Sequence, residues 1–128
     1  MNVLDENVTR DQAELLEKWG IRCRSLSRDL RCQGMQDENI LPFLLRLKRP
    51  TFLTRDADFF DRRLVHDRYS LAWFEVDTAE TAFFIRRFLS HPLFRTGAQR
   101  LGKVVHIQAS GMEYWTRKSD VLVQVEWV

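Results

Sequence analysis

The sequence lacks the features of secreted, membrane-spanning and zinc-thiolate proteins. Its two cysteines, Cys23 and Cys32, have no CxxC pair or Cys/His set beside them, which favours free thiols over a disulfide or a zinc site. No run of about 18 apolar residues occurs, as a membrane span would require. Asp5 and Glu6 interrupt the N-terminus before any stretch typical of a signal peptide. These absences predict a cytoplasmic protein with no membrane partner.

The sequence also has no large excess of one charge sign. Its 20 basic and 18 acidic residues give a formal net charge of +2. Such a balance does not by itself indicate a polyanionic partner, so any affinity for nucleic acid must come from local clusters. Neither a GxxxxGK[ST] nucleotide loop nor a GxSxG elbow occurs. With 45% hydrophobic and 30% charged residues, the chain is predicted to fold as one globular domain over 1–128.

Short apolar segments alternate with amphipathic ones along the first 100 residues, which is typical of an α/β fold with a mainly parallel sheet flanked by helices. Thr9 and Gln12 are predicted to form a capping box, and Gly20 to end the helix that it opens. Asp37 is predicted to cap a second helix, with Pro42 in or near its first turn. The expected strands are 2–4, 21–26, 51–54 and 69–76, and the expected helices are 10–19, 37–48 and 78–91.

The pattern changes after residue 100, where three β-like runs follow one another at 103–110, 111–117 and 120–128. Turn residues separate them, and no helical period lies between them. In the last run valines and a tryptophan alternate with mostly polar residues, as on a strand with one wet face. The sequence therefore predicts an α/β core over 1–100 and a C-terminal antiparallel β extension over 101–128.

Acidic side chains follow the predicted strands at the points where they end. Asp5 follows the first strand, Asp56 and Asp58 follow the third, and Asp37 with Glu38 begins a helix expected to open on the same edge. Carboxyl ends of parallel strands converge, and ligands bind where the strand order reverses. Clustered carboxylates repel one another unless a cation neutralises them, and oxygen-only ligands favour Mg²⁺ or Mn²⁺ over zinc. The alternative is structural, since aspartates at such positions commonly cap helices.

Three segments taken together resemble the small bacterial PIN-like proteins: LDENV at 4–8, GMQDENIL at 34–41 and TFLTRDADF at 51–59. The family's pattern is a Leu-Asp-Glu-Asn opening, an acidic helix start after a glycine, and a Thr-Arg-Asp-x-Asp-Phe strand end. The resemblance covers about residues 1–90. It implies a PIN-like fold related to VapC-like toxins, which are Mg²⁺- or Mn²⁺-dependent ribonucleases that use three or four carboxylates. The terminal extension has no counterpart in that pattern.

Carried over position by position, the resemblance implies a catalytic site with one or two Mg²⁺ or Mn²⁺ ions. Glu38 stands beside Asp37 and is the alternative metal ligand at that place. Thr54 is expected to orient the acids by hydrogen bonding. The catalytic and metal-binding carboxylates that the resemblance implies are Asp5, Asp37, Asp56 and Asp58.

Arginines close in sequence to the aspartates are candidates for binding RNA phosphates: Arg55, Arg62, Arg63 and Arg68. As a group they favour contact with single-stranded RNA, although each one alone is equally explained as a solvent-exposed charge. His66 is the only histidine near them, and a metal-activated water does not need it as a proton donor. His91 and His106 have no ligand-like spacing and are predicted to be surface or partly packed groups.

The sequence therefore predicts a metal-dependent ribonuclease that acts on single-stranded RNA, with a toxin restrained by an antitoxin protein as one candidate role. The alternative is a noncatalytic PIN-like module that binds RNA or a protein, since PIN-like folds include members that have lost cleavage. The apolar helix at 78–91 suits either the core or a homodimer face.

A receiver-like phosphoacceptor domain fits the sequence less well. Its acidic pair, acceptor aspartate, threonine and lysine are mimicked by Asp5, Glu6, Asp56, Thr78 and Lys103. Receivers, however, carry a Met-Pro turn after the acceptor, which is missing here. Their lysine also ends a strand, whereas Lys103 is expected to begin one.

Overall fold

The computed structural model describes residues 1–128 and has an α/β architecture built on one seven-stranded sheet. The strands are β1 (Asn2–Leu4), β2 (Arg24–Ser25), β3 (Thr51–Thr54), β4 (Ser70–Glu75), β5 (Lys103–Gln108), β6 (Gly111–Thr116) and β7 (Val123–Val125). The helices are α1 (Arg10–Lys18), α2 (Asp37–Leu44), α3 (Thr81–Ser90) and α4 (Gly97–Arg100). Three 3₁₀ turns complete the fold: η1 (Ala57–Phe59), η2 (Arg62–Leu64) and η3 (Thr78–Glu80).

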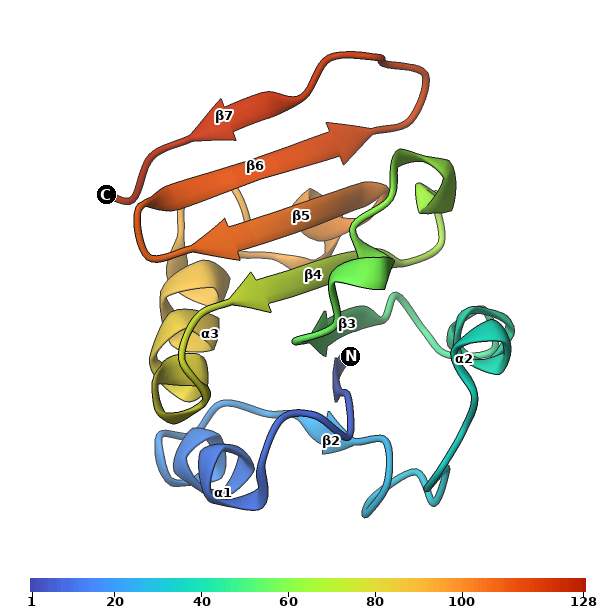
Figure 1. Cartoon of the computed structure of the whole chain (residues 1–128), viewed down its shortest axis with the longest axis vertical. Helices are drawn as coiled ribbons and strands as arrows, with labels where there is room; N and C mark the ends of the chain where they lie inside the picture. The colour runs from blue at the N-terminus through green and yellow to red at the C-terminus, as the bar shows by residue number, and fades with distance from the viewer.

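The sheet has the order β2-β1-β3-β4-β5-β6-β7, and its first five strands run parallel. Strands β6 and β7 are antiparallel, so the arrowhead of β6 points against those of β4 and β5 (Figure 1). The predicted α/β class with a mainly parallel sheet is confirmed. The predicted boundary at residue 101 is wrong for β5, which pairs in parallel with β4 and completes a β4–α3–β5 unit. A period-two pattern is the same for parallel and antiparallel strands, so the sequence could not separate them.

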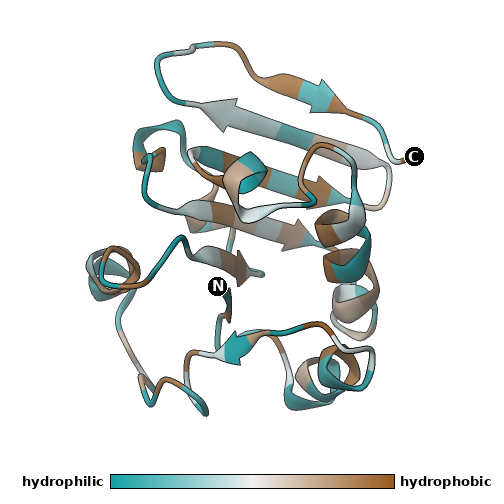
Figure 2. Cartoon of the chain, turned by 180° about the vertical axis from the view of Figure 1, so that it is seen from behind, coloured by the Kyte–Doolittle hydropathy of each residue, from teal (hydrophilic) through white to brown (hydrophobic).

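Alternation along the parallel strands supplies two cores, one on each face of the sheet. One face carries Leu53 and Val105, which pack with α1 and α3. The other carries Phe52 and Val104, which pack with α2 and the crossover between β3 and β4. This crossover passes in front of β4 in Figure 1, and hydrophobic colour marks both the central strands and the helices that cover them in Figure 2. Each such buried side chain contributes about 1.5–3 kcal/mol of transfer free energy, so the strand ends are firmly placed.

The start of α1 differs from the predicted capping box. Thr9 is the N-cap residue but makes no side-chain capping hydrogen bond. Gln12 is buried, and its side-chain oxygen accepts the backbone N–H of Ala82 at 2.8 Å. That N–H lies in the first turn of α3, where backbone N–H groups have no partner within the helix. The side chain of Gln12 therefore caps α3 instead of completing a capping box at the start of α1. Gly20 does follow the helix as predicted, with a φ of +77° that favours glycine.

Strand β2 and helix α2 are shorter than the predicted segments 21–26 and 37–48. Strand β2 lies at the edge of the sheet and pairs only with β1, through two residues. Helix α2 contains Pro42 and ends at Leu44. Its N-cap residue is Gln36, not Asp37 as predicted, and no side chain caps it. The carboxylate of Asp37 is therefore free for another role.

The apolar stripe of α3 is mainly a core feature. Phe84, Ile85 and Phe88 are buried, whereas Phe83 is 42% exposed. Arg87 places its guanidinium 4.2 Å from the ring centre of Trp127, which extends the packing to the end of the chain. Most of the apolar stripe is therefore buried within the chain, and Phe83 is its exposed member.

The two cysteines are free thiols, as predicted. Burial raises the pKa of Cys23 to about 12, so this thiol is almost entirely protonated at neutral pH and a poor nucleophile. None of the helices has the length and apolar character that a bilayer crossing demands.

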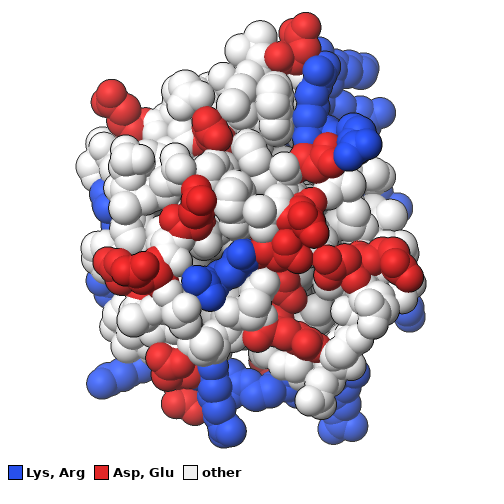
Figure 3. Space-filling model, in the orientation of Figure 1, with Lys and Arg blue, Asp and Glu red and all other residues white.

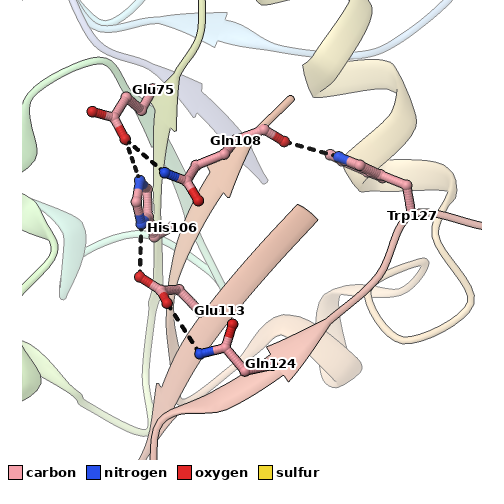
Figure 4. A network of polar contacts seen from close by, with 6 residues as sticks. All are labelled: Glu75, His106, Gln108, Glu113, Gln124 and Trp127. Carbon is pink, nitrogen blue, oxygen red and sulfur yellow. Dashed lines mark hydrogen bonds and ion pairs between the residues drawn. The ribbon is translucent and has the colours of Figure 1, made fainter. Parts of the chain in front are cut away.

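His106 joins the core of the sheet to its C-terminal strands. Its side chain is buried, contrary to the predicted surface or partly packed position, and stacks on Trp73 with ring centres 4.0 Å apart. Nε2 lies 2.9 Å from Oε1 of Glu75 on β4, and Nδ1 lies 2.9 Å from Oε2 of Glu113 on β6 (Figure 4). An ionised carboxylate only accepts hydrogen bonds, so each ring nitrogen that carries a hydrogen can donate to the glutamate beside it.

The glutamates of this network titrate below their ordinary range. Hydrogen bonds from Gln108 and then His106 lower the pKa of Glu75, and the hydrogen bond from His106 is the main cause that lowers the pKa of Glu113. A lowered pKa in the folded state stabilises the fold above the unfolded value of 4.5, and this contribution is lost as the pH falls through the folded pKa.

We expect His106→Phe to keep the stack on Trp73 and to remove both ring nitrogens that contact the glutamates. At pH 7 the free energy of unfolding should fall measurably, because the hydrogen bonds to the glutamates are lost. Below about pH 4.5 the difference from wild type should shrink, because the glutamates become protonated in both proteins. Urea unfolding at several pH values measures this, with His66→Phe as the control, since His66 stacks on Tyr69 without a glutamate partner. Equal stability of His106→Phe and wild type at pH 7 would contradict the assignment.

Candidate metal centre

The acidic residues gather where the order of the strands reverses. From β1 the chain moves to one side to form β2 and then crosses back to form β3 on the other side. Asp5 directly follows β1, and Asp56 comes two residues after the end of β3. In an open α/β sheet the crevice at this point is the usual place for a ligand.

Asp37, Asp56 and Asp58 form a three-carboxylate cluster at this edge. Each contributes one carboxylate oxygen, and the three oxygens lie within 4.8 Å of one another. Asp56 accepts the backbone N–H of Asp58 at 2.9 Å, which caps η1 and fixes the two side chains relative to each other. This bond uses only one oxygen of Asp56, so capping and metal binding are compatible. The cluster has the donors and the spacing to hold a metal ion.

Thr54 connects the cluster to Asp5. The threonine is fully buried, and its hydroxyl donates to Oδ2 of Asp5 at 2.6 Å while accepting the N–H of Asp56 at 3.0 Å. The other oxygen of Asp5 accepts the N–H of Glu6 at 2.7 Å. Asp5 therefore lies beside the three-carboxylate cluster with both oxygens engaged, and it is not one of the three.

Two acids of the site hold their protons more tightly than usual. Burial is the main cause that raises the pKa of Asp5, and hydrogen bonds from Thr54 and the N–H of Glu6 oppose it. Loss of surrounding water, followed by the charge of Asp56, raises the pKa of Asp37. Burial and, after it, neighbouring negative charge therefore disfavour the ionised forms of Asp5 and Asp37, and a bound cation would offset both effects.

Two supporting residues were not identified from the sequence, although both belong to the LDENV segment. Asn7 donates from Nδ2 to the hydroxyl of Thr54 at 3.3 Å and accepts the N–H of Arg55 at 3.0 Å. Glu6 accepts the N–H of Gly34, which ties the loop before α2 to the end of β1. Only their adjacency to Asp5 could have indicated these roles. Glu38, the predicted alternative ligand, is exposed and lies outside the three-carboxylate cluster.

The structure does not bring the four predicted arginines together around the acids. Arg55 stays at the acidic edge, where Nη2 donates to the carbonyl of Val76 at 3.2 Å and the buried Nε has no hydrogen-bond partner. The crossover then runs back to the amino end of β4, which carries Arg68 and His66 to the opposite edge. The other contacts are Arg62 above the ring of Trp115, Arg63 paired with Asp61, and Arg68 donating to the carbonyl of Leu45.

A cavity of about 480 Å³ lies near Asp56, although none of the three cluster aspartates lines it. Arg55 and Ala57, the chain neighbours of Asp56, form one side of it. Its charged lining is mainly acidic and consists of Arg55, Glu75, Asp77 and Glu80. Acidic side chains also spread across the middle of the face seen in Figure 3. The surroundings of the cluster are therefore more acidic than basic.

Comparison with known proteins finds no family model, no curated protein and no solved structure that matches the chain. The ligand atoms of the cluster still indicate which class of metal ion it suits. It consists of carboxylate oxygens without histidine or cysteine, and hard divalent cations prefer such ligands.

We expect Asp37→Asn to weaken Mn²⁺ binding by about 10–100-fold, the range found even when a group that only supports a ligand is lost. Glu38→Gln removes the same charge one residue away, outside the three-carboxylate cluster, and should leave affinity nearly unchanged. Calorimetric or electron-spin-resonance titration with Mn²⁺ measures both. Equal weakening by the two variants would show a diffuse electrostatic effect instead of ligation by Asp37.

Proposed function

We propose that the chain is a Mg²⁺- or Mn²⁺-dependent ribonuclease of PIN-like fold that cleaves single-stranded RNA at the three-carboxylate cluster. The observation that carries this proposal is the meeting of Asp37, Asp56 and Asp58 at the reversal of strand order. The three segments that resemble PIN-like proteins all contribute: LDENV supplies Asp5 and its support, GMQDENIL supplies Asp37, and TFLTRDADF supplies the rest. RNA as the substrate rests on that resemblance.

In this proposal the chain supplies position and charge. Asp37, Asp56 and Asp58 hold the metal, which when bound supplies a Lewis acid and a more acidic water for phosphodiester hydrolysis. Thr54, through its bonds to Asp5 and to the N–H of Asp56, keeps the end of β3 in place. Because Thr54 is fully buried, water does not compete for its hydroxyl.

Arg55 is the arginine best placed to meet the substrate. It lines the cavity at the acidic edge, and although its Nε is buried and its Nη2 donates to the carbonyl of Val76, the guanidinium has further N–H groups that could bind phosphate oxygens. The three other predicted arginines lie along or beyond the crossover. They would contact the RNA only if the RNA extended from the acidic edge around to the other side of the molecule. We therefore propose a short contact with the substrate, centred on one phosphodiester next to Arg55.

A second candidate function is a noncatalytic module that binds a protein. The acidic cavity beside the cluster favours it, because Glu75, Asp77 and Glu80 repel phosphates. The same lining is complementary to a basic peptide segment. In this alternative the cluster extends an acidic docking surface.

We expect Asp56→Asn to lower Mn²⁺-dependent cleavage of single-stranded RNA by at least about 100-fold, because it removes a central ligand of the cluster. Asp61→Asn is the matched control: Asp61 caps η2 as Asp56 caps η1, but it lies outside the three-carboxylate cluster. Cleavage of a labelled oligonucleotide at saturating Mn²⁺ measures both, and circular dichroism checks the fold.

The outcome separates the two candidate functions. Loss of cleavage in Asp56→Asn but not in Asp61→Asn supports the ribonuclease. A wild-type protein that binds Mn²⁺ yet leaves single-stranded RNA uncut would contradict it and would favour the protein-binding module.

A further inference from the structure

A second cavity lies beside the edge strand β2, and none of the aspartates of the three-carboxylate cluster lines it. It has a volume of about 920 Å³ and lies between α1, the amino end of β1, and β2 with its flanking loops. Cys23 and Ala13 form part of its wall. Its charged side chains are Glu17, Arg22, Arg24, Arg28, Asp29 and Arg100. Nothing in the proposed ribonuclease mechanism uses this cavity.

Arg100 is the unusual member of this lining, because it is 7% exposed and forms no ion pair. Its guanidinium donates to neutral acceptors only: the hydroxyl of Thr51 at 2.9 Å, the carbonyl of Phe94 at 2.7 Å and, more weakly, Oδ1 of Asn2 at 3.5 Å. Buried charges in proteins are normally paired. Arg100 therefore brings an uncompensated positive charge to the wall of an open cavity.

The other arginines of the cavity are also without carboxylate partners. Arg22, Arg24 and Arg28 are exposed and form no ion pair. Of the two acids, Asp29 is engaged by the backbone N–H of Ser25 at 2.7 Å. Four arginines against two acids leave the lining with two positive charges in excess.

We propose that this cavity is a binding site for a phosphate monoester. A dianionic phosphate would balance the excess charge of the lining, and guanidinium groups match phosphate oxygens in geometry. The volume exceeds what inorganic phosphate fills and lies within the range of cavities that hold small organic ligands, about 300–1,000 Å³. The phosphate lies against Arg100, and the organic part of the ester extends between α1 and β2.

The competing explanation is that Arg100 only holds segments together. Its hydrogen bonds link the starts of β1 and β3 to the loop after α3, so replacing it also endangers the fold. The exposed arginines separate the two explanations. The side chains of Arg22 and Arg24 make no contact that the fold needs. If Arg100 had only a structural role, replacing Arg22 and Arg24 would not change the binding of any ligand.

The test uses inorganic phosphate and adenosine 5′-monophosphate as probes, with the full chain and in excess EDTA, so that no metal at the acidic cluster can recruit the anion. Calorimetry gives the Kd, and ¹H–¹⁵N NMR locates the site. We expect saturable binding, tighter for the nucleotide than for inorganic phosphate, with shifts of the Gly20, Ser25 and Arg100 Nε signals. The double variant Arg22→Gln/Arg24→Gln should weaken nucleotide binding by about tenfold or more.

The matched control is Arg117→Gln/Lys118→Gln, which removes two positive charges from exposed positions that follow β6, outside the cavity and at the far side of the sheet from β2. It should leave the Kd within about twofold, because distant exposed charges are screened. Absence of saturable binding at millimolar nucleotide would overturn the proposal, as would equal weakening by both double variants. Binding of succinate with no binding of either phosphate would overturn the phosphate assignment. Asp56→Asn should leave nucleotide binding unchanged, so this site and the ribonuclease are tested independently.

Discussion

The hydrogen bond between Thr54 and Asp5 is the contact on which the candidate site depends. At 2.6 Å and without exposure to water, it joins the ends of two adjacent parallel strands. The same hydroxyl accepts the N–H of Asp56, so one oxygen atom sets the position of acids that are far apart in the sequence. The sheet supplies the rigidity for this arrangement, because both strands are fixed by apolar side chains on either face. A site built on strand ends can hold like charges closer together than a surface loop could.

Much of this arrangement could be predicted from the sequence, because it follows from local patterns and one topological rule. Alternating apolar and amphipathic segments give the α/β class, and aspartates after the first and third strands converge wherever the strand order reverses between them. Asp37 was predicted both as a helix cap and, from the resemblance, as a metal ligand, and only the capping role is wrong. The sequence suggests a helix cap, whereas the helix begins one residue earlier than a capping aspartate requires.

What the sequence could not supply depends on tertiary contacts. Gln12 looks like part of a capping box and instead serves α3, and His106 lacks any ligand-like spacing because its partners come from two other strands. The arginines after Asp58 are near the acids in the sequence but not in space, since the crossover must return to the start of β4. Arg100 gives no local signal at all, and only the packing around it shows that its charge is buried without a counterion.

The three aspartates of the acidic site are held by parts of the fold that differ in how firmly they are anchored. Asp56 and Asp58 belong to the end of a core strand, whereas Asp37 reaches them on a helix tied to β1 through the contact between Glu6 and Gly34. An ion shared by these carboxylates would act as a reversible cross-link between α2 and the sheet. Closing a long chain segment in this way has an entropic cost that grows slowly with length. Occupancy by metal and order in the 27–36 segment would therefore rise and fall together.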